Sequence, residues 1–325
     1  MNNLNHYYKS DKCNIFYWEG AISDKFISQL DDSCFIFEQF LWNVEYPRGL
    51  KNQLYTLEVH METINQRCEK LAPKFDVKTQ MIYCSPNEQV HQYIKKSGYA
   101  SILLNHNCFL DYNKFLLKEG QDREYNAVIN SRPFWWKRIY LAENVKNLAY
   151  IAGKDWANDE NSWTGYKDWN NVSVFHKIPY YEVNEIYNKS MCGLVLSGCT
   201  GDNHQKLMEG ANYSSSEYLF CGLPVVSTKS QGGREYWFDE KNSIICDPSA
   251  QSVKESVELI IEKLNNGEMN RAEIRQTQIQ KMNEMRKNFI TKTQEIFNDK
   301  KIDENSSKYF DDNYFHKMTD YSYEE

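Results

Sequence analysis

The chain has 325 residues, about twice the length of a typical domain, so we expect two domains. Its 41% hydrophobic and 26% charged residues are ordinary for a folded protein and exclude a mostly disordered chain. The formal net charge of −7 weighs against a protein that binds DNA chiefly by neutralising phosphates, unless a local basic face lies within that total.

Cysteine usage and hydropathy indicate the compartment. The nine cysteines are an odd number without C-x-x-C spacing, which favours reduced thiols over a disulfide scaffold or a zinc site. No run approaches the roughly 18 apolar residues of a membrane span, and the first residues lack the basic start and apolar segment of a secretion signal. We therefore expect a cytoplasmic protein without a transmembrane segment.

In chain order, apolar runs of strand length alternate with amphipathic stretches of helix length, the pattern of parallel α/β architecture. The first part predicts strands at 13–18, 34–37, 79–84 and 101–104, and helices at 22–31, 53–72 and 87–97. A charged segment around 113–124 then indicates a hinge. The second part predicts strands at 126–130, 147–153, 172–175, 193–197, 224–228 and 243–247, and helices at 134–146, 181–190, 214–221, 250–264 and onward to about 295.

These elements predict two domains and a tail. The expected domains are residues 1–120 and 121–290, and residues 291–325 hold the end of the last helix and an acidic, tyrosine-rich tail. An open parallel sheet binds its ligand at the carboxyl ends of its strands, so the residues that follow each strand are the candidates for a site.

The most informative stretch runs from residue 193 to 248. Glu209 and Glu217 lie eight residues apart, with a turn rich in glycine and serine between them, and Glu217 falls in the first turn of the predicted helix. A helix N-terminus offers free N–H groups and the positive end of a dipole, which suits a phosphate. The simpler alternative is that Glu217 only stabilises its own helix and Glu209 is a solvated loop charge.

The pair stands in a longer pattern that resembles one family. The order E-x7-E, Cys221-Gly222-Leu223-Pro224-Val225-Val226, Gly232-Gly233, Glu235 is similar to that of the retaining, family 4-like (group 1) glycosyltransferases. Upstream, the segment 178–187, Ser197 and the Arg132-x4-Lys137 spacing match further marks of that family. Two segments at 83–86 and 105–115 resemble the marks that close its N-terminal domain.

The resemblance implies a role for each matching residue. Arg132 and Lys137 would hold the donor diphosphate, and Glu209 would contact the transferred sugar; these three form the implied catalytic set. Glu217 would hold the ribose, and backbone groups near Ile178 would recognise the nucleobase. The implied donor-binding residues are Ser131, Arg132, Lys137, Ile178, Gly210, Ser214, Ser215 and Glu217. An ordinary solvated pair is the alternative for Arg132 and Lys137.

The resemblance also implies fold and reaction. The fold would be GT-B, two Rossmann-like parallel-sheet domains that face a central cleft, and the reaction would transfer a hexosyl or pentosyl group from a nucleoside-diphosphate sugar to an acceptor hydroxyl with retention of configuration. The acceptor could be a glycan, a lipid-linked glycan or another hydroxyl compound. The chain has no Asp-x-Asp, so we expect no metal, no metal ligands and no further cofactor. One alternative is a phage-type transferase that acts on hydroxymethylated DNA bases, and another is a degenerate protein that only binds a nucleotide sugar.

The N-terminal part departs from the family pattern. It is shorter than usual, and Glu38 stands near the place where many members carry a histidine. Glu38 and His106 are therefore open candidates for the site, against ordinary loop or packing roles. For Trp135 and Trp136 the alternatives are packing against the sheet and stacking on a substrate ring. The sequence leaves the oligomeric state open.

Overall fold

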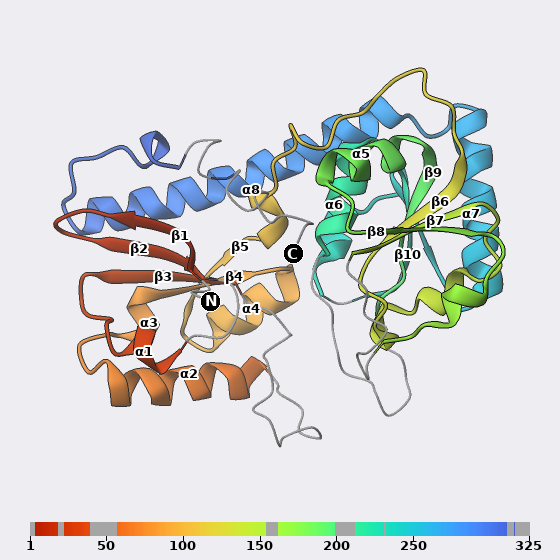
Figure 1. Cartoon of the computed structure of the whole chain (residues 1–325). Helices are drawn as coiled ribbons and strands as arrows, with labels where there is room; N and C mark the ends of the chain where they lie inside the picture. The colour runs from red at the N-terminus through yellow and green to blue at the C-terminus, as the bar shows by residue number, and fades with distance from the viewer. Residues whose placement is uncertain are drawn as a thin grey trace. The chain divides into compact units, whose positions relative to one another are not determined.

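The computed structural model describes residues 4–18, 23–39, 57–153, 162–198, 212–230, 232–310 and 315. The chain divides into two compact units, each built around one sheet (Figure 1). The first unit holds residues 1–109 and 283–318, and the second holds residues 110–282 and 319–325. The sequence predicts boundaries after residues 120 and 290, whereas the contacts within each unit place them after residues 109 and 282. One reason is that the Arg275 guanidinium donates to the carbonyl oxygens of Tyr112 and Phe115, which ties this stretch to the second unit.

The first unit has a five-stranded sheet in the order β1-β2-β3-β4-β5. Its strands are β1 (Leu4–Lys9), β2 (Asn14–Trp18), β3 (Cys34–Gln39), β4 (Met81–Ser85) and β5 (Ala100–Leu103). Its helices are α1 (Asp24–Ile27), α2 (Leu57–Leu71), α3 (Val77–Gln80), α4 (Glu88–Lys96) and the 3-10 turns η1 (His106–Phe109) and η6 (Ser306–Lys308). The sequence did not predict β1, which is an edge strand antiparallel to β2, whereas the other neighbours are parallel.

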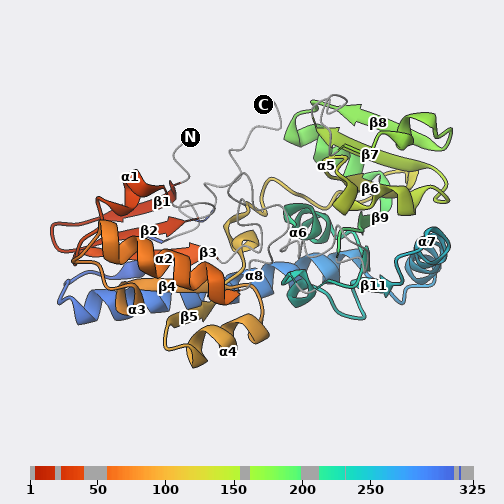
Figure 2. The ribbon, with the colours of Figure 1, turned by 90° about the horizontal axis from the view of Figure 1, so that it is seen from below.

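Two different cores cover the faces of the first sheet. Under α2 the core is mainly aliphatic, with Ile36, Ile64 and Met81 among its buried residues. On the other face aromatic rings pack together. The ring of Phe289 in α8 (Arg271–Asp299) lies 4.6 Å from the ring of Phe37, measured between centroids. Figures 1 and 2 show α2 and the end of α8 on opposite sides of this sheet. The last part of α8 thus packs on the sheet of the first unit.

The second unit has a six-stranded parallel sheet in the order β11-β10-β9-β6-β7-β8. Its strands are β6 (Tyr125–Asn130), β7 (Leu148–Gly153), β8 (Val172–His176), β9 (Ser190–Val195), β10 (Val225–Thr228) and β11 (Ser243–Cys246). Its helices are α5 (Tyr180–Asn188), α6 (Tyr213–Phe220), α7 (Ala250–Asn265) and the first part of α8, with 3-10 turns η2 (Trp135–Lys137), η3 (Ile139–Ala142), η4 (Gly165–Asp168) and η5 (Arg234–Trp237). This is the strand order of the Rossmann fold, and it reverses between β6 and β9.

The predicted helix at 134–146 is wrong. In its place two 3-10 turns, η2 and η3, meet at Arg138, whose φ of 50° lies in the left-handed region. The Arg138 side chain is 2% exposed, and its Nε donates to the carbonyl oxygen of Leu196 at 2.7 Å. The left-handed φ of Arg138 is incompatible with a regular helix, and it accompanies the hydrogen bond from the Arg138 guanidinium to the residue that follows β9.

Helix α6 ends at a glycine that the structure requires. Gly222 has a φ of +64°, and a Cβ built on it would lie 2.4 Å from the carbonyl oxygen of Arg271. A left-handed residue after a helix is commonly glycine, because other residues there are strained. At Gly267 the φ is +80°, but nothing lies within 4 Å of the same added atom.

We predict that Gly222→Ala lowers the free energy of unfolding by about 3 kcal/mol, because backbone strain and a clash with a carbonyl add together. The control Gly267→Ala should lose about 1 kcal/mol, from strain alone. Urea unfolding of both variants followed by circular dichroism measures the difference. Equal losses would contradict the close approach of Gly222 to α8.

Candidate active site

An open pocket lies at the carboxyl ends of β6 and β9, where the strand order of the second sheet reverses. Its lining residues are Ile129, Asn130, Ser131, Lys137, Leu194, Val195, Leu196, Ser197, Asn212 and Ser214. In an open α/β sheet this reversal is where loops part and leave room for a ligand. The pocket therefore lies where the fold rule places a binding site, and it belongs to the second unit alone.

Three of the residues implied by the sequence line this pocket: Ser131, Lys137 and Ser214. Ser215 is buried beside them, and its hydroxyl donates to the carbonyl oxygen of Asn212 at 2.6 Å, so here it stabilises the start of α6. Arg132 is an exposed residue next to Ser131, and Ile178 is half-buried after β8. Glu209 and Gly210 lie outside the described residues.

Lys137 is the most perturbed cation of the pocket. Burial, together with the nearby guanidinium groups of Arg132 and Arg234, lowers its pKa from the ordinary 10.5 to about 7. Burial and the two neighbouring positive charges thus both disfavour the charged form of Lys137 unless an anion is present. The alternative of a solvated pair at Arg132 and Lys137 does not describe Lys137.

Arg234 is a residue that the sequence reasoning missed. It follows the Gly232-Gly233 turn, is 1% exposed, and its Nη1 donates to the Ser197 hydroxyl at 2.8 Å. Its Nη2 donates to the Thr228 carbonyl oxygen at 2.7 Å and to that of Ser197. Arg234 therefore joins the ends of β9 and β10 beneath the pocket. The only signal in the sequence is an arginine directly after the glycine pair.

Glu217 lies in the second turn of α6, not in the first turn as the sequence predicts, because the helix begins at Tyr213. Its carboxylate is 3% exposed and accepts the Tyr187 hydroxyl proton at 2.7 Å. The Asn130 side-chain amide donates both to the Tyr187 oxygen, at 2.5 Å, and to Glu217 at 3.4 Å. A glutamate at the fifth position of the helix with these partners does not cap it, and the N-cap residue is Asn212. The helix-stabilising alternative for Glu217 is therefore wrong.

The two ends of helix α6 have different surroundings: the N-terminal end lines the pocket, and the C-terminal end contacts two arginines. Asn212 and Ser214 at its N-terminal end line the pocket. At its other end Arg271 donates to the carbonyl oxygen of Cys221 at 3.0 Å, and Arg275 donates to that of Phe220. Cations at the C-terminal carbonyls and an anion at the N-terminus both agree with the helix dipole.

The other candidates have different surroundings. In the first unit Glu38 is 2% exposed within β3 and His106 is 6% exposed in η1, so neither is a solvated loop residue. Trp136 is half-buried against Phe134, with ring centroids 4.6 Å apart, whereas Trp135 is 53% exposed. Packing against the sheet therefore does not describe Trp135.

The described residues show no disulfide, no metal-binding cluster and no membrane-spanning helix. The eight cysteines that the structure describes are all buried and free of disulfides. The described residues contain no group of three or more metal-ligating side chains. Among the described helices, none is long and apolar enough to cross a membrane.

Comparison with known proteins agrees with this geometry. Residues 136–281, which lie within the second unit, match the family model described as Glycosyl transferases group 1. This match contains Lys137, Arg234 and the whole of α6. No curated protein sequence matches the chain.

Solved structures share the fold at low identity. They include sucrose-phosphate synthase from Thermosynechococcus elongatus, with 13% identity and a TM-score of 0.52 over 82% of this chain and 66% of that one. The pneumococcal O-GlcNAc transferase GtfA in complex with UDP and GlcNAc has 13% identity and a TM-score of 0.53 over 84% and 54%. Anabaena Alr3699/HepE in complex with UDP has 12% identity and a TM-score of 0.52 over 94% and 77%. The chain thus spans about two thirds and about half of the first two, and the predicted GT-B class of α/β fold is confirmed.

Lys137 should destabilise the folded state wherever it must remain charged. Because folding lowers its pKa to about 7, the unfolded state binds more protons between about pH 7 and pH 10, and the free energy of unfolding rises with pH across this window. Below about pH 7 Lys137 is charged in both states, and the whole desolvation penalty remains.

We therefore predict that Lys137→Met raises the Tm at about pH 6 and that this gain shrinks towards about pH 10. Thermal melts across this range measure the difference, and Lys146→Met, at an exposed position, is the control. A gain that is the same at every pH, or a loss at about pH 6, would contradict the lowered pKa.

Proposed function

We propose that the protein is a glycosyltransferase that moves a sugar from a nucleoside-diphosphate sugar to an acceptor hydroxyl. The observation that carries the proposal is the position of Lys137, which lines the pocket together with Asn212 and Ser214 at the N-terminal end of α6 and whose pKa burial and the charges of Arg132 and Arg234 lower. Such a place is suited to a group with several negative charges, and a diphosphate has them. The group 1 domain match supports the same reading.

The cations would act mainly on the leaving group. As the bond between sugar and phosphate breaks, negative charge grows on the diphosphate, and fixed positive groups stabilise that charge as it develops. Lys137, with a pKa of about 7, would take up a proton when the diphosphate binds, because the anion favours the charged amine. Arg132 would hold the same group, with the hydroxyls of Ser131 and Ser214 beside it.

The remaining roles follow the family resemblance. Glu217 would accept the ribose hydroxyls, Glu209 would contact the transferred sugar next to Gly210, and Ile178 would face the base. The sugar would be a hexosyl or pentosyl group transferred with retention, and the leaving phosphate oxygen would take the acceptor proton. GtfA and HepE are named as complexes with UDP, so UDP is the first nucleotide to test here.

The direct test is binding and turnover by the purified chain. A thermal-shift panel of UDP, GDP, ADP and CDP identifies the nucleotide, since a ligand at 100 times its Kd adds about 2.7 kcal/mol of stability. Release of that nucleotide from its sugar conjugates then measures turnover. If no nucleotide stabilises the protein, the proposal fails.

We predict that Lys137→Ala lowers this turnover at least about tenfold in a folded protein, because it removes a charge that matters most as the leaving group departs. The matched control Lys146→Ala removes an exposed lysine and should leave turnover unchanged. Equal rates in the two variants would remove Lys137 from the reaction.

We also propose that the reaction needs no metal. The chain has no Asp-x-Asp, and Lys137 and Arg132 would neutralise the diphosphate in place of a metal ion. Turnover should therefore persist in excess EDTA at its full rate. Loss of activity that Mg²⁺ or Mn²⁺ restores would contradict the role given to Lys137 and Arg132.

A further inference from the structure

A second group of cations gathers at the opposite end of the same sheet, where β6 and β9 begin. The backbone N–H groups of Glu124 and Tyr125 donate to the Lys189 carbonyl oxygen at 2.8 and 3.0 Å. Arg271 donates from Nη1 to the carbonyl oxygen of Ser190, the next residue, at 3.4 Å. Arg123, which precedes Glu124, and Arg271 are therefore both held next to residues 189–190. The donor pocket lies at the far ends of these six-residue strands, roughly 20 Å away.

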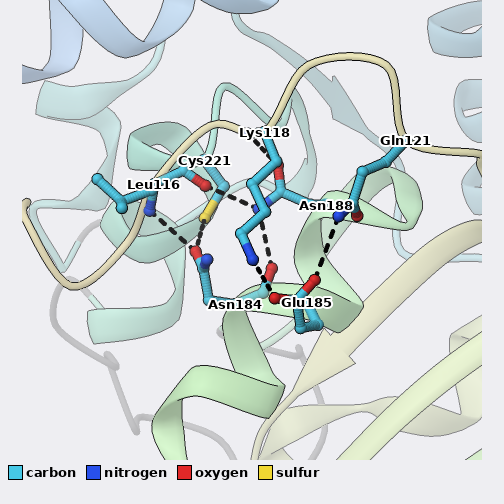
Figure 3. A network of polar contacts seen from close by, with 7 residues as sticks. All are labelled: Leu116, Lys118, Gln121, Asn184, Glu185, Asn188 and Cys221. Atoms are coloured by element: carbon cyan, nitrogen blue, oxygen red, sulfur yellow. Dashed lines mark hydrogen bonds and ion pairs between the residues drawn. The ribbon is translucent and has the colours of Figure 1, made fainter.

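The carboxylates near residues 189–190 already have cationic partners. Glu124 forms an ion pair with Lys189 at 2.8 Å. Glu185 pairs with Lys118, and it also accepts the side-chain amide of Gln121 at 3.3 Å (Figure 3). Arg275, the next arginine along α8, is held by the carbonyl oxygens of Tyr112, Phe115 and Phe220. In the part of the chain that the structure describes, neither Arg123 nor Arg271 has a carboxylate partner.

Arg123 and Arg271 each keep a buried donor without an acceptor. Arg123 Nη1 and Arg271 Nε have no hydrogen-bond partner in the described part of the chain. Burial lowers the pKa of Arg123, and burial together with the Arg123 charge lowers that of Arg271 to about 9, so both remain cationic at neutral pH. Two desolvated like charges with unused donors are unfavourable unless an anion lies between them.

We propose that Arg123 and Arg271 form a binding site for a tetrahedral oxyanion, either free phosphate or a phosphomonoester, at the amino-terminal edge of the second sheet. Planar guanidinium groups bind such anions through paired N–H donors, which the buried Arg123 Nη1 and Arg271 Nε supply. Both residues are half-buried, whereas the two unpaired donor atoms are themselves buried, so an anion that binds them would be largely removed from solvent. The site is separate from the donor pocket and does not depend on the proposed transferase activity.

The experiment is a phosphate titration of melting temperature at constant ionic strength, with phosphate-free protein as the start. It is made in the Lys137→Ala background, so that phosphate in the donor pocket does not contribute. The double variant with Arg123→Gln tests the site, and Arg67→Gln, which removes an arginine paired with Asp24 in the first unit, is the matched control.

Phosphate should raise the Tm of Lys137→Ala saturably, by about 3–5 °C at ten times the Kd, and the Arg67→Gln control should behave alike. Adding Arg123→Gln should abolish this rise and, without phosphate, should raise the Tm because the repulsion of Arg271 is removed. Glycerol 3-phosphate in a parallel titration separates a free phosphate site from a phosphomonoester site by the larger shift.

The proposal is overturned if phosphate gives no saturable shift, or if the shift is the same with and without Arg123. It is also overturned if Arg123→Gln lowers the Tm in phosphate-free buffer. A purely structural arginine predicts that last result.

Discussion

The hydrogen bond from the Tyr187 hydroxyl to the Glu217 carboxylate joins the elements on which the pocket depends. It connects α5 to α6, and Asn130 at the end of β6 donates to both partners. Tyr218, the next residue of α6, accepts the Asn130 backbone N–H at 2.7 Å and packs so close to β9 that a Cβ at Gly193 would lie 2.2 Å from its ring. A buried carboxylate is stable only with such partners, so its position and that of the helix are fixed together.

The same helix gives the pocket its electrostatic character. Its N-terminal end lines the pocket, and Arg271 and Arg275 satisfy its C-terminal carbonyls. The buried guanidinium groups of Arg138 and Arg234 donate hydrogen bonds to carbonyl oxygens at the carboxyl ends of β9 and β10. Burial, together with the charges of Arg132 and Arg234, lowers the pKa of Lys137 in this pocket. The charged form of Lys137 thus destabilises the folded protein at a place where a bound anion would stabilise it.

The sequence predicts well whatever depends on local pattern. Strands β6, β7, β8, β10 and β11 begin and end within one residue of the predicted ranges, because buried parallel strands are short apolar runs between turn residues. Lys137 was found because the Arg132-x4-Lys137 spacing resembles the pattern of the glycosyltransferase family. The missed features depend on tertiary contacts. The break at Arg138 accompanies a hydrogen bond to Leu196, and the buried Arg234 donates hydrogen bonds to Ser197 and Thr228. Strand β1 is a polar edge strand that pairs only with β2 among the described strands.

We propose that the Glu217 carboxylate, which accepts a hydrogen bond from Tyr187, binds the ribose of a nucleoside diphosphate. The most direct test is calorimetric titration of UDP and of 2′,3′-dideoxy-UDP, which lacks both ribose hydroxyls, into the wild-type protein and Glu217→Gln. Charge-assisted hydrogen bonds contribute about 1.5–3 kcal/mol each, so UDP should bind the wild type at least about tenfold more tightly than the dideoxy analogue. Glu217→Gln should lose that difference while its Tm without ligand changes little. Equal affinity of the wild type for both nucleotides, or unchanged UDP affinity in Glu217→Gln, would contradict the account.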